Sequence, residues 1–550
     1  MVKIKFVKIG TILISVIITM TALAGCAGKD NANSKKDQII RYNLGAEPKT
    51  LDPGLTNTTE GITVAANSFE GLLRLDEKEN IVPGVAEKWE VSSDGLKYTF
   101  NLRKDAKWSD GKSVKAEDFK YAWQRALDPN IASEYAYQLF YIKNGEAFNK
   151  GKVKAEDLGI KVIDDSKLEV TLEYPTSYFL SLTAFPTYSP VRKDIVEKDP
   201  KAWSNKADTF VCNGPFKMQE WKLKDSINFV KNDNYWNAKS IKLDSLQFKL
   251  LEQASSALSA FRAGQIDFME APPLQETPKL LKEGVAKAYP YLGTCYISLN
   301  VSPKAKEVSA DAAKALSNPK VRKALALAID RTQIVQNVTK GGQKPATAFV
   351  STGISEDKSG KDFRNKDYYK PEADVVEAKK LLAEAGYPDG KGFPKLSYLY
   401  NTAEDNKNIA ETLQDMWRKN LGITVDLINQ EKKVFMNTRK NKEYLTARGS
   451  WIADYSDPMT FLDIWVTNGG NNNTGYSNPE YDKKVGAAKL EKDTAKRMQL
   501  LHEAEDILMN DMPVIPIYFY VSVGCSKDYV KGVHKSPLGM TLFDTAYIQK

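Results

Sequence analysis

The chain has 550 residues, with 78 Lys and Arg against 70 Asp and Glu, which gives a net charge of +8 at pH 7. This excess is small for the length, and no Lys/Arg cluster with interleaved aromatic residues stands out, so we expect no nucleic-acid partner. A chain this long exceeds what one hydrophobic core normally covers, and two or three lobes are therefore expected.

The first 25 residues have the pattern of a secretion signal. Lys3, Lys5 and Lys8 form a basic start, and the mostly apolar stretch that follows is too short and too mixed to span a membrane. Removal of this segment takes away three lysines and no acid, so the net charge of +8 falls to +5.

The signal ends in Leu23-Ala24-Gly25-Cys26, which resembles the lipobox of bacterial lipoproteins. The resemblance implies that Cys26 becomes the mature N-terminus and carries a lipid. Residues 26–37 would be the lipidated Cys and a flexible polar tether. One lipid on a tether anchors a protein without spanning the membrane. We therefore expect an extracytoplasmic protein anchored to the cell membrane, and the lysine-rich composition favours a Gram-positive cell surface.

Three further cysteines, Cys212, Cys295 and Cys525, remain in the mature chain. An odd number excludes a complete disulfide framework, although two of the three could pair in an oxidising compartment. The sequence does not choose between the pairings.

Short strands and turns dominate the first part of the mature chain. Residues Tyr98 to Leu102 alternate as a strand does, and Ser109-Asp110-Gly111 indicates a turn. Residues Ala116 to Leu127 have a helical pattern that Asp128-Pro129 ends.

Two helices are expected near the middle of the chain. Asn318-Pro319 caps and starts one that buries Val321, Leu325 and Ile329 at four-residue spacing. The other runs from about residue 373 to 385 and stops at Gly386.

A further helix places Ile409, Leu413 and Trp417 on one face and ends near Gly422, and a strand at 423–427 follows. The last helix, about 495–509, leads into an apolar strand at 514–521. Helices and strands in this order indicate an α/β fold.

Many sequence blocks, taken together and in order, resemble the oligopeptide-binding proteins of bacterial ABC importers, the extracellular solute-binding proteins of family 5. The match runs from about residue 40 to the C-terminus. Its blocks are AEPKTLDP, FEGLLRLD, residues 82–129, Asn213 to Phe216, Asn234 to Trp236, Phe261 to Asp267, Val321 to Arg331, Lys379 to Gly386, residues 448–458, Asn471 to Asn473 and Pro513 to Pro516.

The resemblance implies a three-lobed, periplasmic-binding-protein-like fold of class II, with a hinge and a central peptide cleft. Lobe I would consist of residues 38–80, 192–292 and 519–550. Lobe II would be residues 81–191 and lobe III residues 293–518. The chain crossings near residues 292 and 519 would form the hinge.

Residues 448–458 begin as a strand and stop at a carboxylate, an aromatic residue and a turn closed by Asp457-Pro458. An exposed strand can pair with another extended chain, and a carboxylate at its end could hold a cation. By itself the pattern is more typical of an ordinary turn. The family resemblance implies that Asp454 holds the α-amino group of a peptide and that Ser450, Trp451 and Ile452 pair with its backbone.

Two arginines and two asparagines are implied by the same resemblance. Arg448 and Arg439 would neutralise carboxylates of the peptide or of the cleft, although each could also be a solvated surface charge. Asn471 and Asn472 would line the cleft, or they could simply form a polar loop.

The chain departs from the best-studied enteric members at several positions. Asn406 stands where those members have a His, and Thr339, followed by Lys340, stands where they have a Lys; both groups bind the peptide's C-terminal carboxylate there. Lys432 replaces a Trp that lines a side-chain pocket, which suggests tolerance of acidic peptides. The cysteine pair of those members corresponds to Gly293 and Ile452, so that disulfide is absent.

Catalysis is not expected. His502 and His534 lie far apart in sequence, and no phosphate loop, nucleophile elbow or Cys-x-x-Cys is present. The carboxylates of Asp454 and Asp457 are three residues apart in a turn and are a weak candidate pair. We expect no enzyme activity, no metal and no cofactor.

The sequence therefore predicts a monomeric, lipid-anchored receptor that closes on short peptides, reads their backbone and termini, and delivers them to the permease of an ABC importer. One alternative is the same fold with a dedicated non-peptide ligand or a single signalling peptide. The alternative from another class is an extracytoplasmic hydrolase.

Overall fold

This computed structural model describes residues 37–356 and 360–549. The largest sheet among these residues has eleven strands. The predicted signal, Cys26 and residues 26–36 of the predicted tether lie outside the described residues. Neighbouring strands follow the order β15 (Val425–Gln430), β14 (Leu396–Asn401), β16 (Thr446–Ile452), β12 (Ala286–Leu299), β17 (Val514–Ser526), β11 (Phe268–Glu270), β1 (Ile39–Asn43), β10 (Ser245–Lys249), β9 (Ser226–Lys231) and β8 (Phe216–Lys222), and β13 (Lys344–Pro345) pairs with β17.

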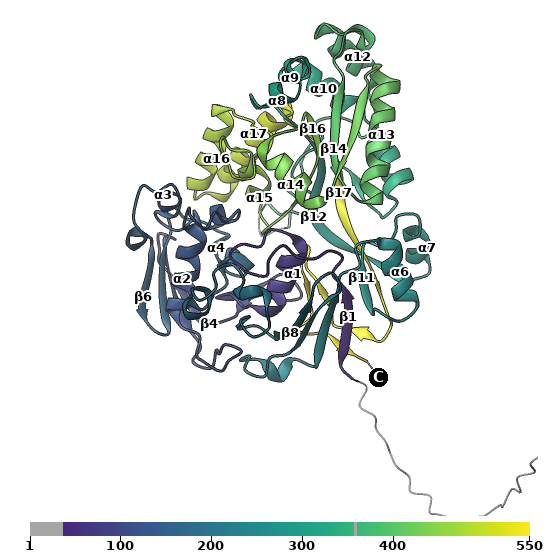
Figure 1. Ribbon diagram of the computed structural model, residues 1–550. Helices are drawn as coiled ribbons and strands as arrows, with labels where there is room; N and C mark the ends of the chain where they lie inside the picture. Colours follow the sequence, from purple (N-terminus) through teal and green to yellow (C-terminus); the bar gives the residue numbers. More distant parts are fainter. Residues whose placement is uncertain (1–36, 357–359, 550) are drawn as a thin grey trace, which may run out of the picture. The chain divides into compact units, whose positions relative to one another are not determined.

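The long strands β12 and β17 connect the two halves of this sheet (Figure 1). The first part of β12 pairs with the end of β17 beside β11, whereas residues from Thr294 onward pair with the start of β17 and with β16. The register between β12 and β17 shifts between Pro290 and Thr294. Leu292 and Phe519, near which the sequence predicts the chain to cross between lobes, lie at or beside this irregular point.

A separate antiparallel sheet lies within predicted lobe II. Its strands follow the order β4 (Ala86–Val91), β5 (Lys97–Leu102), β7 (Lys167–Thr171) and β6 (Ile160–Asp164). Helix α2 (Ala116–Leu127) has the predicted bounds and buries Phe119, Trp123 and Ala126. These three lie on one helical face because they are four and three residues apart.

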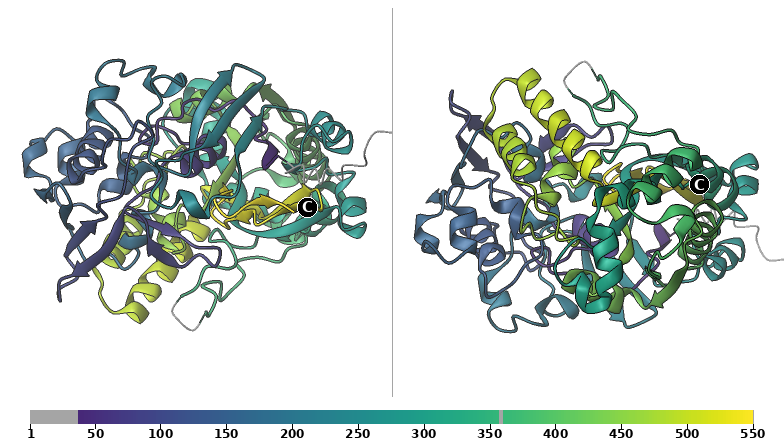
Figure 2. Two further views of the ribbon diagram at one scale, coloured as in Figure 1. Left: turned by 90° about the horizontal axis from the view of Figure 1, so that it is seen from below. Right: turned by 90° about the horizontal axis from the view of Figure 1, so that it is seen from above.

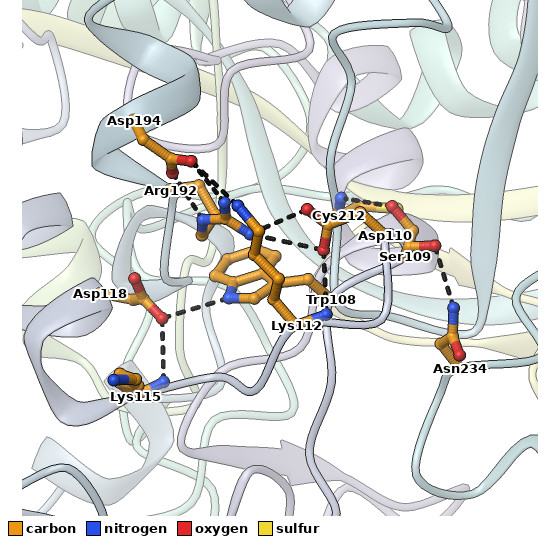
Figure 3. Close-up of polar contacts among 10 residues, drawn as sticks. All are labelled: Trp108, Ser109, Asp110, Lys112, Lys115, Asp118, Arg192, Asp194, Cys212 and Asn234. Atoms are coloured by element: carbon orange, nitrogen blue, oxygen red, sulfur yellow. Dashed lines mark hydrogen bonds and ion pairs between the residues drawn. The ribbon is translucent and has the colours of Figure 1, made fainter.

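A polar cluster ties residues 108–118 of predicted lobe II to residues 192–234 of predicted lobe I (Figure 3). The Arg192 guanidinium donates two hydrogen bonds of 2.6 Å to Asp194 and contacts Asp110 at 3.1 Å. The Arg192 contact lowers the pKa of Asp194 to about 2. Ser109 N–H donates to the carbonyl oxygen of Cys212 at 2.7 Å, and Asn234 donates to the carbonyl oxygen of Ser109 at 3.0 Å. The turn predicted at 109–111 thus joins the two lobes.

Helix and strand ends differ from the predictions by a few residues. Helix α10 (Pro319–Leu327), capped by the side chain of Asn318, ends before Ile329 because Asp330 caps a new short helix, α11 (Arg331–Gln333). Ile329 is buried all the same. Helix α12 (Val375–Glu384) is shorter than the predicted 373–385, since the side chain of Asp374 caps it.

Helix α13 (Glu404–Leu421) ends at Gly422, whose φ of +70° is easy for glycine alone. The following strand, β15, begins at Val425, two residues after the predicted start, where its parallel pairing with β14 begins. Helix α17 (Thr494–Asp511) is slightly longer than predicted. Strand β17 runs five residues beyond the predicted end at 521, because its end still pairs with β11 and β12.

The C-terminal residues lie beside the start of β1 (Figure 2). There the side chain of Gln38 donates to the carbonyl oxygen of Ile548 at 3.0 Å and accepts from its N–H at 2.9 Å. The main hydrophobic core extends through all three predicted lobes and includes the fully buried Trp123, Trp203 and Trp417.

The remaining elements are short strand pairs and helices of the described residues. The strands are β2 (Leu73–Leu75), β3 (Ile81–Pro83), β18 (Val530–Lys531), β19 (His534–Lys535), β20 (Thr541–Leu542) and β21 (Tyr547–Ile548). The α-helices are α1 (Thr59–Ser68), α3 (Gly145–Asn149), α4 (Phe179–Leu182), α5 (Lys193–Val196), α6 (Ala254–Arg262), α7 (Thr277–Lys282), α8 (Ala305–Val308), α9 (Ala310–Ser317), α14 (Lys432–Asn441), α15 (Met459–Leu462) and α16 (Pro479–Leu490). The other helical turns are η1 (Ala136–Leu139), η2 (Ala155–Asp157), η3 (Pro186–Tyr188), η4 (Trp203–Asn205), η5 (Ala238–Ser240), η6 (Ile334–Thr339), η7 (Pro388–Gly390) and η8 (Asp463–Trp465).

Candidate functional site

Strand β16 has one edge that no described strand covers along most of its length. On one side it pairs with β12 from Thr446 to Ile452. On the other side β14 pairs with it only at Thr446 and Ala447. From Arg448 onward, the second edge is therefore open to another extended chain.

The ladder shows which backbone groups face this open edge. Ala453 N–H donates to the carbonyl oxygen of Leu292, its partner across the ladder, at 2.8 Å. Because alternate residues of an antiparallel strand direct their N–H and C=O to opposite sides, those of Ser450 and Ile452 point away from β12. Two of the three predicted backbone-pairing residues thus present both hydrogen-bonding groups to the open edge, while Trp451 faces β12.

Asp454 follows the end of β16 and has a buried carboxylate with three neutral donors. Tyr135 donates to Oδ1 at 3.0 Å. Tyr137 and the Gln138 amide donate to Oδ2 at 2.9 and 2.7 Å. Thr460 Oγ1 accepts the backbone N–H of Asp454 at 3.1 Å and fixes the turn. No cationic side chain among the described residues forms an ion pair with this carboxylate.

Burial raises the pKa of Asp454 from 3.8 to about 7, although the hydrogen bonds from Tyr137, Tyr135 and Gln138 act to lower it. Neutral donors stabilise the carboxylate less than a cation at contact distance would. The site is therefore built to gain from a positively charged ligand group.

Some buried polar atoms that lack a protein partner lie on β16 or beside Asp454. In native proteins such atoms are few, because an unpaired buried polar group costs about 1–3 kcal/mol. Within the described part of the chain, three of them are Arg448 Nε and Trp451 Nε1 of β16 and Gln138 Oε1, on the amide that donates to Asp454. A bound ligand with both donors and acceptors would satisfy them.

Neither predicted arginine has an acidic partner among the described residues. Arg448 donates to the Tyr520 hydroxyl at 3.1 Å and reaches Asn401 Oδ1 at 3.5 Å. Arg439 is buried, donates to Ser298 Oγ at 3.3 Å and lies over the ring of Phe435. Both guanidinium groups therefore retain a full positive charge for an anion to neutralise.

Two ion pairs connect helix α14 to the predicted lobes I and II. Lys432, the first residue of α14, contacts Glu60 of α1 at 3.0 Å. Lys440, near its end, contacts Glu134 at 3.6 Å. The Lys432 side chain is 45% exposed and that of Glu60 only 16%. Lys432 thus forms a partly exposed ion pair between α14 and α1.

Tyrosine contacts hold predicted lobe II against the turn that follows β16. The rings of Tyr178 and Tyr455 stack with centroids 4.7 Å apart, and the hydroxyls of Tyr141 and Tyr455 lie 3.2 Å apart. With the bonds from Tyr135 and Tyr137 to Asp454, these contacts join residues 135–178 directly to the turn after β16.

The asparagines differ in how available their side chains are. Asn472 is buried, and its amide donates to the carbonyl oxygens of Trp465, Val466 and Tyr476. Its side chain stabilises its own loop, so we leave Asn472 out of the proposed ligand set. The side chain of Asn471 is half-buried and stays a predicted contact.

The side chains at the positions that differ from the enteric members form hydrogen bonds within this protein. Asn406 donates to the carbonyl oxygen of Asn401 at 3.0 Å at the end of β14. Thr339 is buried and contacts the carbonyl oxygen of Val335, and Lys340 reaches Gln275 at 3.4 Å. A neutral amide and hydroxyl thus replace the two basic groups of those members.

Gly293 and Ile452 lie directly opposite one another in the β12–β16 ladder. A Cβ on Gly293 would lie 2.3 Å from Ile452 Cδ1, so the isoleucine occupies the space that glycine leaves. The remaining cysteines, Cys212, Cys295 and Cys525, are all buried free thiols. No disulfide joins any two of them, which answers the question that the sequence left open.

Other groups considered for chemistry have structural contacts. His502 stacks on Phe363 and contacts Glu356 at 2.6 Å, and His534 contacts Glu79 at 2.9 Å. A cavity of about 60 Å³ lies away from β16, beside Glu70, Arg74 and Asp544. The described residues contain no cluster of three His, Cys, Asp or Glu side chains with metal-site geometry, and none of their helices could cross a membrane.

Sequence reasoning missed the donors that predicted lobe II contributes to the site. Tyr135, Tyr137 and Gln138 lie within the run Glu-Tyr-Ala-Tyr-Gln at 134–138. The only signal was two tyrosines close together in a segment without regular periodicity. Their distance in sequence from Asp454, more than 300 residues, concealed the contact.

The sequence profile of the bacterial extracellular solute-binding proteins, family 5 middle region, matches residues 80–473. The oligopeptide-binding protein OppA of Bacillus subtilis is 39% identical over 535 residues, which cover 96% of this chain and 95% of that protein. The Haemophilus influenzae OppA complex with RPPGFSPFR is similar in structure, with a TM-score of 0.86 and 36% identity over 94% of this chain and 99% of that one.

Two structures of the murein tripeptide binding protein MppA match this chain to different extents. The Escherichia coli structure has a TM-score of 0.85 and covers 94% of this chain and 99% of that one. The unliganded open form has a TM-score of 0.66 and covers 93% and 98%. Both are 34% identical to this chain, so the lower score of the open form does not come from a more distant sequence.

Proposed function

Since this chain belongs to the bacterial extracellular solute-binding proteins of family 5, we propose that it captures short peptides in a closing cleft and delivers them to the permease of an ABC importer. The observation that carries the proposal is the open edge of β16 next to the buried Asp454 carboxylate, which has no cationic partner among the described residues. A peptide offers the two complements: a backbone that can pair and a terminal ammonium.

The direction of the bound peptide follows from the charges along the strand. Acceptors lie at the end of β16, on Asp454 and Gln138, and the guanidinium of Arg448 lies at its start. A peptide with its ammonium at Asp454 would run antiparallel to β16, and its carboxylate would approach Arg448. The seven residues from Arg448 to Asp454 span about 20 Å when extended, which suits about four to six peptide residues.

Recognition through the backbone and the terminal ammonium allows peptides of many different sequences to bind. Each backbone hydrogen bond to Ser450 or Ile452 contributes about 0.5–1.5 kcal/mol whatever the side chains are. The ammonium at Asp454 fixes the register. The side chains of the peptide are then restricted only where they contact the walls of the cleft.

Delivery requires that the closed form release its ligand to a partner. We place the hinge at the irregular point of β12 and β17, between Pro290 and Thr294 and near Phe519. A ligand shifts the equilibrium toward the closed form only by binding that form better than the open one. The tyrosine contacts between lobes II and III support a closed form of low energy.

The membrane attachment and the monomeric state are further parts of this proposal. Cys26 would carry a lipid that holds the receptor beside its permease, on the outer face of the cell membrane. Radiolabelled palmitate should be incorporated into the wild-type chain and not into Cys26→Ala, and that variant should appear in the culture medium. Size-exclusion chromatography with light scattering of residues 27–550 should give the mass of one chain.

Native mass spectrometry of residues 27–550, before and after mild denaturation, tests the peptide proposal. A series of co-purified masses that match short peptides of mixed sequence supports a promiscuous peptide receptor. One discrete mass would indicate a dedicated ligand. A protein that arrives empty and stays empty against a synthetic peptide library overturns the proposal, and an added peptide recovered in cleaved form would indicate a hydrolase.

A further inference from the structure

Gln138 is a fully buried amide that uses only half of its hydrogen-bonding capacity. Its Nε2 donates to Asp454 Oδ2 at 2.7 Å and to the Tyr137 hydroxyl at 3.3 Å. Its Oε1 is buried and has no partner among the described residues. Only the nitrogen of an amide can donate to a carboxylate, so the contact with Asp454 sets the orientation and leaves the oxygen unpaired.

The backbone of Gln138 is held in place by its own contacts. Its carbonyl oxygen accepts from the Tyr188 hydroxyl at 2.6 Å, and its N–H donates to the carbonyl oxygen of Tyr135 at 3.0 Å. Tyr188 is itself fully buried. Because the side chain is also buried and its nitrogen is held by Asp454, the unpaired oxygen cannot turn toward solvent without breaking that bond.

The Asp454 carboxylate has room for one more donor. Its Oδ2 already accepts from Tyr137 and Gln138, while Oδ1 accepts from Tyr135 alone. Since a carboxylate oxygen accepts about two hydrogen bonds, one place remains on Oδ1. A terminal ammonium, which has three N–H donors, would find its first acceptor there and would still need a second.

We propose that Gln138 Oε1 accepts a second N–H of the ligand's terminal ammonium and thereby determines which amines this site admits. The inference rests on the proposed function, in which Asp454 binds that ammonium. Primary ammonium groups, and secondary ones such as that of an N-terminal proline, supply two N–H donors and are accepted. A dimethylated terminus keeps its charge but has one N–H, so it leaves Gln138 unpaired and is discriminated against.

The test uses one peptide, the tightest binder of a synthetic library of tri- to hexapeptides, with its terminus unmodified, monomethylated, dimethylated or acetylated. Isothermal titration calorimetry compares the wild type with Gln138→Met, which keeps the volume and removes the acceptor. In the wild type, dimethylation should weaken binding about tenfold or more relative to monomethylation, because one charge-assisted hydrogen bond is lost. In Gln138→Met that difference should fall to about twofold or less.

A matched control lies in the distant part of the sheet. Asn228 of β9 also donates to a carboxylate, that of Glu220 at 3.4 Å, and its Oδ1 is also buried and unpartnered. Asn228→Leu should leave the methylation series as in the wild type. Circular dichroism checks that both variants are folded, and the series on the wild type alone remains informative if Gln138→Met does not fold.

Two failures can be told apart. If no unmodified peptide of the library binds the wild type, the proposed function is wrong. If peptides bind but monomethyl and dimethyl forms bind the wild type equally, or the difference persists unchanged in Gln138→Met, then Gln138 only orients Asp454 and the inference is overturned.

Discussion

Arg497 forms a bidentate ion pair with Asp457, with N–O distances of 2.8 Å to both carboxylate oxygens. Both side chains are about nine-tenths buried. Of the two carboxylates in the turn after β16, Asp457 is therefore neutralised within the protein. Asp454, three residues earlier, has only neutral hydrogen-bond donors among the described residues.

This difference predicts opposite effects for two similar substitutions. Asp454→Asn should abolish measurable peptide binding while the protein remains folded, because it removes the charge that holds the ammonium. Asp457→Asn should lower the free energy of unfolding by about 3 kcal/mol or more, since it leaves the Arg497 guanidinium buried without its counter-charge. Calorimetry and thermal unfolding would measure the two effects. Unchanged affinity in Asp454→Asn would refute the site assignment.

The raised pKa of Asp454 predicts a pH dependence of binding. In the closed, empty protein the carboxyl titrates near pH 7, and an ammonium ligand requires its ionised form. Below pH 7 binding must release a proton, so affinity should fall by up to about tenfold per pH unit. Above pH 8 the peptide amine, with a pKa of about 7.7–8.0, loses its own proton. Affinity should therefore be highest between pH 7 and 8.

Titrations in buffers of different ionisation enthalpy would detect the released proton. An affinity that is constant from pH 5 to 7 would mean that the empty protein is open, with Asp454 in solvent.

The pH dependence of the free energy of unfolding gives a second test of the raised pKa of Asp454. A carboxyl whose pKa is higher in the folded than in the unfolded chain favours folding at low pH, and that contribution is lost as the pH rises through 7. Relative to the wild type, Asp454→Asn should therefore become more stabilising between about pH 4 and 7, and its effect should level off above pH 7.

The open edge of β16 can be tested with proline. Ser450→Pro removes an N–H that faces the open edge, so the protein should fold and bind peptides about tenfold more weakly. Ala453→Pro is the matched control, because its N–H bonds to the carbonyl oxygen of Leu292. That variant should instead lose stability, seen as a lower Tm. Equal effects of the two changes would contradict the deduced orientation of the strand.

Arg448 should recognise the peptide's carboxylate. Amidation of the C-terminus should weaken binding of tetra- to hexapeptides to the wild type about tenfold, as expected when a charge-assisted hydrogen bond of about 1.5–3 kcal/mol is lost. In Arg448→Met the free acid and the amide should bind alike. Peptides of two residues, whose carboxylate does not reach Arg448, serve as the control. If the free acid is still preferred in the variant, another cation binds the carboxylate.

The Glu60–Lys432 pair should contribute modestly to closure. Lys432 is nearly half exposed, so screening limits the contribution to about 0.2–1 kcal/mol. Lys432→Met should weaken binding of an uncharged-side-chain peptide by twofold to fivefold at low salt and by less at 1 M salt. Glu60→Gln should have the same effect, and the double variant no more than either alone. An additive double variant would show that the two residues act separately.

Several features were predictable because they depend on short stretches of sequence. The bounds of α2 follow from its apolar spacing and from Asp128-Pro129, and the end of α13 follows from Gly422. The position of Asp454 at the end of a strand was also evident. Element ends such as those of β15 and β17 were less accurate, since pairing partners remote in sequence determine where a strand stops.

The sequence by itself determined the family, the α/β fold and the strand with its terminal carboxylate, because ordered motifs and local periodicity record them. Only the tertiary structure decided which carboxylate of the turn is left without a cation, which edge of β16 is open, and that Gln138 lies against Asp454. These are relationships between segments far apart in the chain. They depend on burial and on geometry across lobes, neither of which leaves a periodic signal in the sequence.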